Sequence, residues 1–162
     1  MFLQLDLSGV AMKRVYLLSA ELKADPEQVA LAQALTLNAS KPRMGLKGTL
    51  GLFGSPEWWA NIEQRKMPLL FVQGTIRSTY YAGMTNESNQ EINSFELWLD
   101  DGTVRHEGFY TNDKADRSLF QAGHRVEIVY AFDELKRQPA EDGGINYSDI
   151  VLEMAVSLEP VK

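Results

Sequence analysis

Residues that often perform catalysis or bind metal ions occur in this chain, but their spacing matches no common chemical pattern. The two histidines are His106 and His124, and no H-x-H or H-x-x-x-H spacing occurs. The absence of cysteine excludes thiolate zinc sites, iron–sulfur clusters and a cysteine nucleophile. Both histidines are therefore predicted to be ordinary strand residues, and we expect no metal ion and no cofactor.

Serine, glycine and acidic residues likewise lack the context of a catalytic or phosphate-binding site. No serine lies in a G-x-S-x-G or S-x-x-K motif. The glycines between residues 45 and 54 recur at every third position, unlike those of a phosphate-binding loop. The carboxylates Glu87, Glu91 and Glu96 lie close together in the sequence, which leaves an uncharacterised hydrolase as one alternative. Without a nucleophile or base signature, however, the chain is expected not to be an enzyme.

The composition narrows the possible partners. The chain has 162 residues, and 16 Lys and Arg stand against 22 Asp and Glu, a formal charge of −6. This sign opposes a general phosphate-binding surface, so nucleic acid is an improbable partner. No apolar run approaches the roughly 20 residues of a membrane span. The apolar segment after Met12 is interrupted by Glu21 too early for a signal peptide, and we therefore expect a cytoplasmic protein.

The elements that position these residues are clearest after Pro68, where apolar and polar residues alternate. In LLFVQGTIR, Leu70, Val72 and Ile76 share one side, which is the pattern of a half-buried strand. Similar alternation occurs twice in NSFELWLDDGTVRHEGFY and once each in HRVEIVYAFD and SDIVLEMAVSLE. Five strands are therefore predicted from residue 69 onward. A polar loop, residues 136–147, joins the last two strands, and the sequence does not define its role.

The pair Asp101-Gly102 predicts a hairpin turn, but two registers are compatible with the sequence. A two-residue turn places Trp98 opposite Arg105 and Glu96 opposite Glu107. The second of these is a like-charge pair, which destabilises a sheet. A three-residue loop shifts the pairing and removes that clash, so the strands are predicted and their register stays open.

The order VQGTI, FELWLDDG, LFQAGHRVEIVY and a final strand resembles a small OB-type barrel. Closure into a barrel would remove the exposed edges that an open sheet leaves. The sequence thus predicts a mainly β (α+β) fold with a five-stranded antiparallel β-barrel. An N-terminal α/β extension, residues 1–54, and a core of residues 55–162 are expected to form one structural domain.

The N-terminal extension is predicted to contain two strands within residues 1–22 and a helix over residues 26–37. Asp25 and Pro26 supply the cap and first-turn residues that start a helix. Within this helix Leu31, Ala34 and Leu35 share one face. The glycine-rich residues 38–54 are predicted to be a linker.

A second short helix begins at Ser55-Pro56-Glu57 and contains the adjacent Trp58 and Trp59. Neighbouring indoles on a helix point about 100° apart, so a helix packed by one face cannot easily bury both. One indole is therefore a candidate for a partner interface, possible self-association included, and we expect a homodimer. The alternative is that the helix lies in a groove that buries both.

Aromatic and arginine residues on the predicted strands suggest a second binding surface that includes Tyr80, Trp98 and Arg105. The leading interpretation is a non-enzymatic interaction protein that acts through protein–protein contacts. One alternative is a single-stranded nucleic-acid-binding module, because such modules stack bases on aromatic side chains. Another is an acidic inhibitor or immunity-type protein that mimics an anionic ligand.

Overall fold

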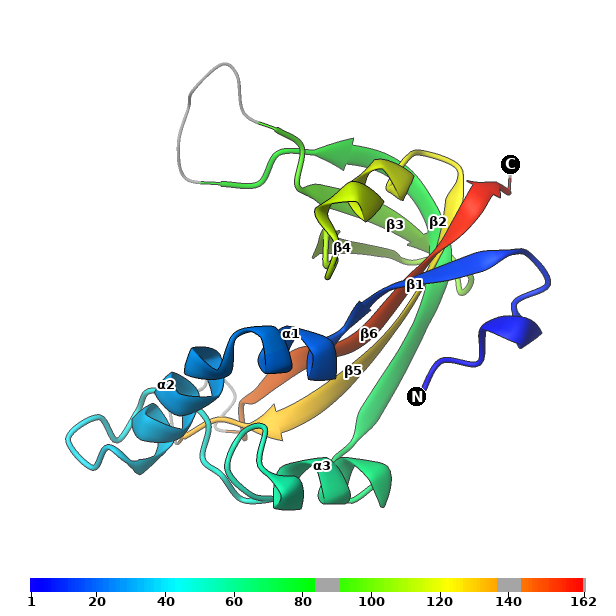
Figure 1. Ribbon diagram of the computed structural model, residues 1–162. Helices are drawn as coiled ribbons and strands as arrows, with labels where there is room; N and C mark the ends of the chain where they lie inside the picture. The colour runs from blue at the N-terminus through cyan, green and yellow to red at the C-terminus, as the bar shows by residue number, and fades with distance from the viewer. Residues whose placement is uncertain (84–90, 137–143, 162) are drawn as a thin grey trace. The chain divides into compact units, whose positions relative to one another are not determined.

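The computed structural model describes residues 1–83, 91–136 and 144–161 (Figure 1). The chain divides into two compact units. The first contains Met1–Leu17, Phe71–Val129 and Glu153–Lys162, and the second contains Leu18–Leu70 and Tyr130–Leu152. No helix among the described residues has the length and apolar character needed to cross a bilayer.

Six strands form one antiparallel sheet in the order β1-β6-β5-β2-β3-β4. In chain order they are β1 Met12–Leu17, β2 Leu69–Tyr80, β3 Ser94–Leu99, β4 Val104–Gly108, β5 His124–Glu134 and β6 Tyr147–Pro160. The α-helices are α1 Leu18–Ala24, α2 Pro26–Leu37 and α3 Pro56–Glu63, and two short 3₁₀ helices span Leu5–Leu7 and Lys114–Leu119.

The prediction of a mainly β fold is confirmed, whereas closure into a five-stranded, OB-like barrel is not. The sheet is open, with β1 and β4 at its edges. The additional strand is β1, which pairs with β6 in register Lys13↔Val156 and Leu17↔Glu153. Alternation in the sequence marks such a segment as extended, but pairing with a strand more than a hundred residues away leaves no local signal. The division into residues 1–54 and 55–162 stays a prediction.

The helices differ from the predictions in two respects, the packing of α2 and the presence of α1. Leu31 is 63% exposed and α2 has no fully buried residue, although Leu35 packs against Gly45. Residues 18–24, which continue the apolar run of β1, form α1 instead of extending the strand. By contrast, α3 begins where predicted, because the Ser55 side chain accepts a hydrogen bond from the Trp58 N–H at 3.2 Å.

The core of the first unit lies beneath β2 and β3. Val72 and Ile76 of β2 are buried, as the alternation predicts. Phe95 of β3 stacks on Phe120, with ring centroids 5.3 Å apart, and Phe120 stacks in turn on Phe109 at 4.4 Å. Stacked aromatic rings of this kind fix the strand that carries them.

Gly74 determines how closely β2 and β3 approach. A Cβ atom at this position would lie 2.4 Å from the Trp98 carbonyl oxygen. Any side chain would therefore push β3 away from β2, so glycine is required here. The close contact holds the Trp98 segment firmly on the sheet.

Asn112 occupies the outer backbone groups at the C-terminal end of β1. Asn112 Oδ1 accepts a hydrogen bond from the Leu17 N–H at 2.8 Å, and Asn112 Nδ2 donates to the Leu17 carbonyl at 3.2 Å. The Asn112 N–H also donates to the Val15 carbonyl at 2.9 Å. One residue thus occupies backbone groups that would otherwise be available to another strand.

Candidate partner-binding surface

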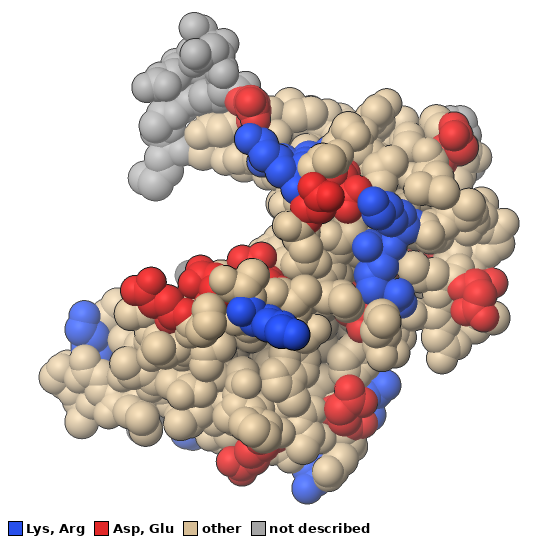
Figure 2. Space-filling model, in the orientation of Figure 1, with Lys and Arg blue, Asp and Glu red and all other residues tan. Residues whose placement is uncertain are grey.

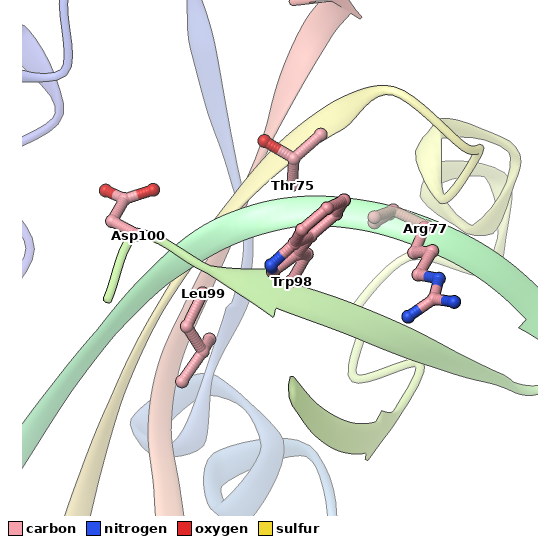
Figure 3. Close-up of a pocket in the computed structure, with 6 residues that line it drawn as sticks. Thr75, Arg77, Trp98, Leu99 and Asp100 are labelled. Atoms are coloured by element: carbon pink, nitrogen blue, oxygen red, sulfur yellow. The ribbon is translucent and has the colours of Figure 1, made fainter. Parts of the chain in front are cut away.

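Trp98 lies at the centre of an exposed surface on β2, β3 and β4. Its side chain is 55% exposed, and its backbone pairs with Thr75 on β2 and Val104 on β4. The guanidinium carbon of Arg77 lies 5.8 Å from the centroid of the indole, which is the geometry of a cation–π contact. Figure 3 shows Trp98 and Arg77 projecting beside the two strands that carry them.

A pocket of about 460 Å³ opens beside the indole. Its lining combines an aromatic ring, aliphatic carbon and charged groups of both signs, contributed by Thr75, Ile76, Arg77, Trp98, Leu99 and Asp100 (Figure 3). Such a mixture of apolar area with a few polar groups is typical of binding sites.

Polar side chains continue the surface away from the pocket. Arg77 Nε lies 3.2 Å from Glu96 Oε1, and Glu96 Oε2 lies 3.8 Å from His106 Nε2. The other ring nitrogen, His106 Nδ1, lies 3.0 Å from the Tyr80 hydroxyl. If that hydroxyl donates, the imidazole proton sits on Nε2 and faces the Glu96 carboxylate. The Glu96 carboxylate is therefore the shared partner of Arg77 and His106 in this series of contacts. We call the surface made by Thr75, Arg77, Tyr80, Glu96, Trp98, Val104 and His106 the hairpin face.

The register of the β3–β4 hairpin explains this arrangement. The Leu99 N–H donates to the Thr103 carbonyl at 2.8 Å, so three residues form the loop, and Gly102 has a φ of +89°. This is the second of the two registers that the sequence allows. Glu96 lies opposite His106 and not Glu107, which replaces a like-charge pair with a favourable one.

Two of the predicted binding residues, Tyr80 and Trp98, are brought together on the hairpin face, but Arg105 is not. Arg105 pairs with the buried Leu97, and alternation along β4 places its side chain on the opposite side of the sheet from Val104 and His106. Arg77, Val104 and His106 were not predicted as binding residues. The parity of Val104 and His106 would have identified them once the three-residue loop was chosen, and Arg77 shares the parity of Thr75 on β2.

The tryptophan pair of α3 lies in the second unit and is largely structural. Trp58 is fully buried, and its Nε1 donates to Asp133 Oδ2 on β5 at 2.9 Å. Trp59 is half-buried and packs edge-on against Trp58, with ring centroids 4.9 Å apart. Burial raises the pKa of the Asp133 carboxyl, while the hydrogen bond from Trp58 acts in the opposite direction. A partner could therefore reach Trp59 but not Trp58.

The acidic residues considered for hydrolysis are Glu87, Glu91 and Glu96, and Glu91 is exposed. Glu87 lies outside these residues, and Glu96 is engaged with Arg77 and His106. His124 is buried, and its Nδ1 lies 2.7 Å from the Ser157 carbonyl oxygen. In residues 1–83, 91–136 and 144–161 no cluster of three or more His, Asp or Glu side chains is arranged to hold a metal ion.

Arginines near the hairpin face are matched by carboxylates. Arg77 pairs with Glu96, and Arg125 contacts Asp100 at 3.1 Å and Glu127 at 3.2 Å. On the face shown in Figure 2, basic and acidic side chains lie next to each other instead of forming one basic field. Nucleic-acid binding draws its affinity from cations available to phosphates, so these pairs weigh against that alternative.

The chain matches a known protein family over most of its length. The family model described as "Immunity protein RhsI2" matches residues 12–157, from the first residue of β1 to near the end of β6. No curated protein matches the chain.

Proposed function

The chain belongs to the RhsI2 family of immunity proteins, and we propose that it neutralises a protein toxin by binding that toxin through the hairpin face. An immunity protein protects a cell from a toxin, and direct binding of the toxin is the simplest way to do so. This proposal joins the leading sequence interpretation, a protein-binding protein, with the immunity-type alternative.

The observation that carries the proposal is the exposure of Trp98 in a fixed setting. Tryptophan and arginine are enriched among the residues that dominate binding energy at protein interfaces. Here the backbone that carries the exposed indole lies close against β2 at Gly74, and the guanidinium of Arg77 lies beside the ring. Little conformational entropy remains to be lost when a partner packs against it.

The charges around Trp98 suggest the character of the toxin surface. Asp100 lines the pocket with its side chain about half exposed, and Asp101 is exposed beside it in the loop. The chain as a whole carries a formal charge of −6. We therefore propose that the contact surface of the toxin is basic, in which case added salt slows association.

The test is protection of cells from a toxin. The chain is co-expressed with toxins from its own genome, and the toxin whose growth inhibition it relieves is the cognate toxin. Trp98→Ala is expected to weaken binding of that purified toxin by about 2 kcal/mol, the usual size for a central aromatic contact. Tyr147→Ala is the matched control, because Tyr147 is similarly exposed but lies outside the hairpin face. Equal affinities for these two variants would move the toxin site elsewhere.

Self-association and a cytoplasmic location stay predictions from the sequence. With Trp58 buried, a homodimer through α3 would have to use Trp59. Sedimentation of the wild-type chain and of Trp59→Ala tests this, since a dimer through this residue shifts toward monomer in the variant.

A further inference from the structure

β4 forms one edge of the sheet. At the other edge, the Leu17 backbone groups of β1 are bonded to Asn112, and the outer backbone groups of β4 are arranged differently. In an antiparallel pair, residues that exchange hydrogen bonds alternate with residues whose N–H and C=O point away from the partner strand. The Leu99 N–H donates to the Thr103 carbonyl, and the Phe109 N–H donates to the Asn93 carbonyl at 2.8 Å. These two contacts set the alternation at both ends of the hairpin.

Continuing the alternation from either end gives the same result. Arg105 and Glu107 exchange hydrogen bonds with β3, whereas Val104, His106 and Gly108 direct their backbone groups to the open edge. The Gly108 N–H donates to the Glu107 side chain at 2.9 Å. Within the part of the chain that the structure describes, the outward backbone groups of Val104 and His106 have no hydrogen-bond partner.

We propose that an extended segment of the toxin pairs with β4 as an added strand, hydrogen-bonded to the outward N–H and C=O groups of Val104 and His106. This inference rests on the proposed function. It commits to the toxin because the open edge is continuous with the hairpin face. The side chains of Val104 and His106 belong to that face, and Val104 lies directly opposite Trp98.

Strand addition also specifies the chemistry of the toxin segment. Main-chain hydrogen bonds supply affinity in this binding mode, and alternate side chains supply specificity. The toxin residue opposite Val104 would lie on the same side as Trp98, and an apolar β-branched or aromatic residue fits best there. With two outward residues, β4 offers about four backbone hydrogen bonds, two donated and two accepted.

The edge can be blocked without disturbing the hairpin. His106→Pro removes an N–H that β3 does not use, and proline is tolerated at such positions of edge strands. His106→Ala is the matched control, because it removes the same side chain but keeps the N–H. We expect His106→Pro to weaken binding of the purified cognate toxin at least about tenfold more than His106→Ala does. Equal losses would overturn strand addition.

A second measurement keeps the inference testable if His106→Pro does not fold, which thermal unfolding reveals. In the wild-type chain, amide hydrogen exchange at Val104 and His106 is expected to slow by about tenfold or more when the toxin is added, because open amides become hydrogen-bonded. The Leu17 amide, already bonded to Asn112, is the internal control. Unchanged exchange at Val104 and His106 would contradict the proposal even if Trp98→Ala weakens binding.

The remaining outcomes separate this inference from the proposed function. Binding that depends on Trp98 but not on the His106 N–H would support the hairpin face and reject strand addition. If no toxin is neutralised, both fail together. If the chain alone is a dimer that His106→Pro dissociates and His106→Ala does not, the occupant of the edge is a second copy, and the toxin strand is rejected.

Discussion

Trp58 and Trp98 show two uses of the same side chain. Trp58 is fully buried, and its N–H is bonded to Asp133, a residue 75 positions away. Trp98 is 55% exposed and rests beside Arg77 on a sheet surface. The conspicuous pair in the sequence, Trp58 and Trp59, thus contributes mainly to the core, whereas the isolated tryptophan is the better candidate for binding. Exposure, not local density of aromatic residues, separates stability from recognition.

The largest expected effect is on stability at Trp58. Trp58→Ala is expected to lower the free energy of unfolding by about 3–5 kcal/mol, since it creates a cavity and leaves the Asp133 carboxyl without its donor. Urea denaturation measures this loss. Trp59→Ala, at the adjacent half-buried position, should cost only about 1 kcal/mol. Comparable losses in the two variants would remove the distinction between them.

Trp98→Ala should affect toxin binding more than stability, the reverse of what is expected for Trp58→Ala. The free energy of unfolding is expected to change by less than about 1 kcal/mol, because the indole is largely exposed. Affinity for the cognate toxin, measured by calorimetry, is expected to fall by about 2 kcal/mol. A variant that binds normally but unfolds easily would show that Trp98 is a structural residue like Trp58.

The pH dependence of stability sharpens the description of the Trp58 site. The folded state raises the pKa of Asp133 above its unfolded value, so the stabilisation is full below the unfolded pKa and is lost as pH rises through the folded pKa. Asp133→Asn keeps an oxygen acceptor for Trp58 Nε1 and carries no charge. Its stability relative to wild type is therefore expected to increase with pH over that window, as followed by thermal unfolding. A pH-independent difference would contradict a raised pKa.

The smallest expected effect concerns the neighbour of Trp98. Arg77→Ala removes the cation–π contact and frees Glu96 from one partner, and it is expected to weaken toxin binding by about 0.5–1 kcal/mol. Arg77→Lys keeps the charge but loses the planar group, so it should recover only part of the loss. Full recovery by lysine would show that charge alone matters at this position.

Sequence patterns predicted the local parts of this fold well. The alternation of Val72 and Ile76 placed β2 correctly, and the Ser55 cap placed the start of α3. The hairpin register was narrowed to two choices, and the like-charge clash between Glu96 and Glu107 pointed to the observed one. Each of these features depends on neighbours within a few residues.

Features that depend on distant contacts were not predicted. The pairing of β1 with β6, the open sheet and the bond between Trp58 and Asp133 all join residues far apart in the sequence. Leu31 of α2 is exposed although it shares a helix face with Leu35. The apolar character of a helical residue does not specify the surface against which that residue packs. Of the predicted binding residues on the strands, Tyr80 and Trp98 lie on one side of the sheet, whereas the register places Arg105 on the other.

The hydrogen bonds that Asn112 makes to β1 also limit what the molecule can build from copies of itself. A filament grows by edge-to-edge pairing only if both edges of each sheet can pair, because each added copy must leave an unpaired edge for the next copy. In this sheet β4 can pair, whereas at β1 the Val15 carbonyl and both Leu17 backbone groups are already bonded to Asn112. A strand that adds along this part of β1 would first have to displace Asn112, so edge-to-edge growth is less favourable at β1 than at the open β4 edge.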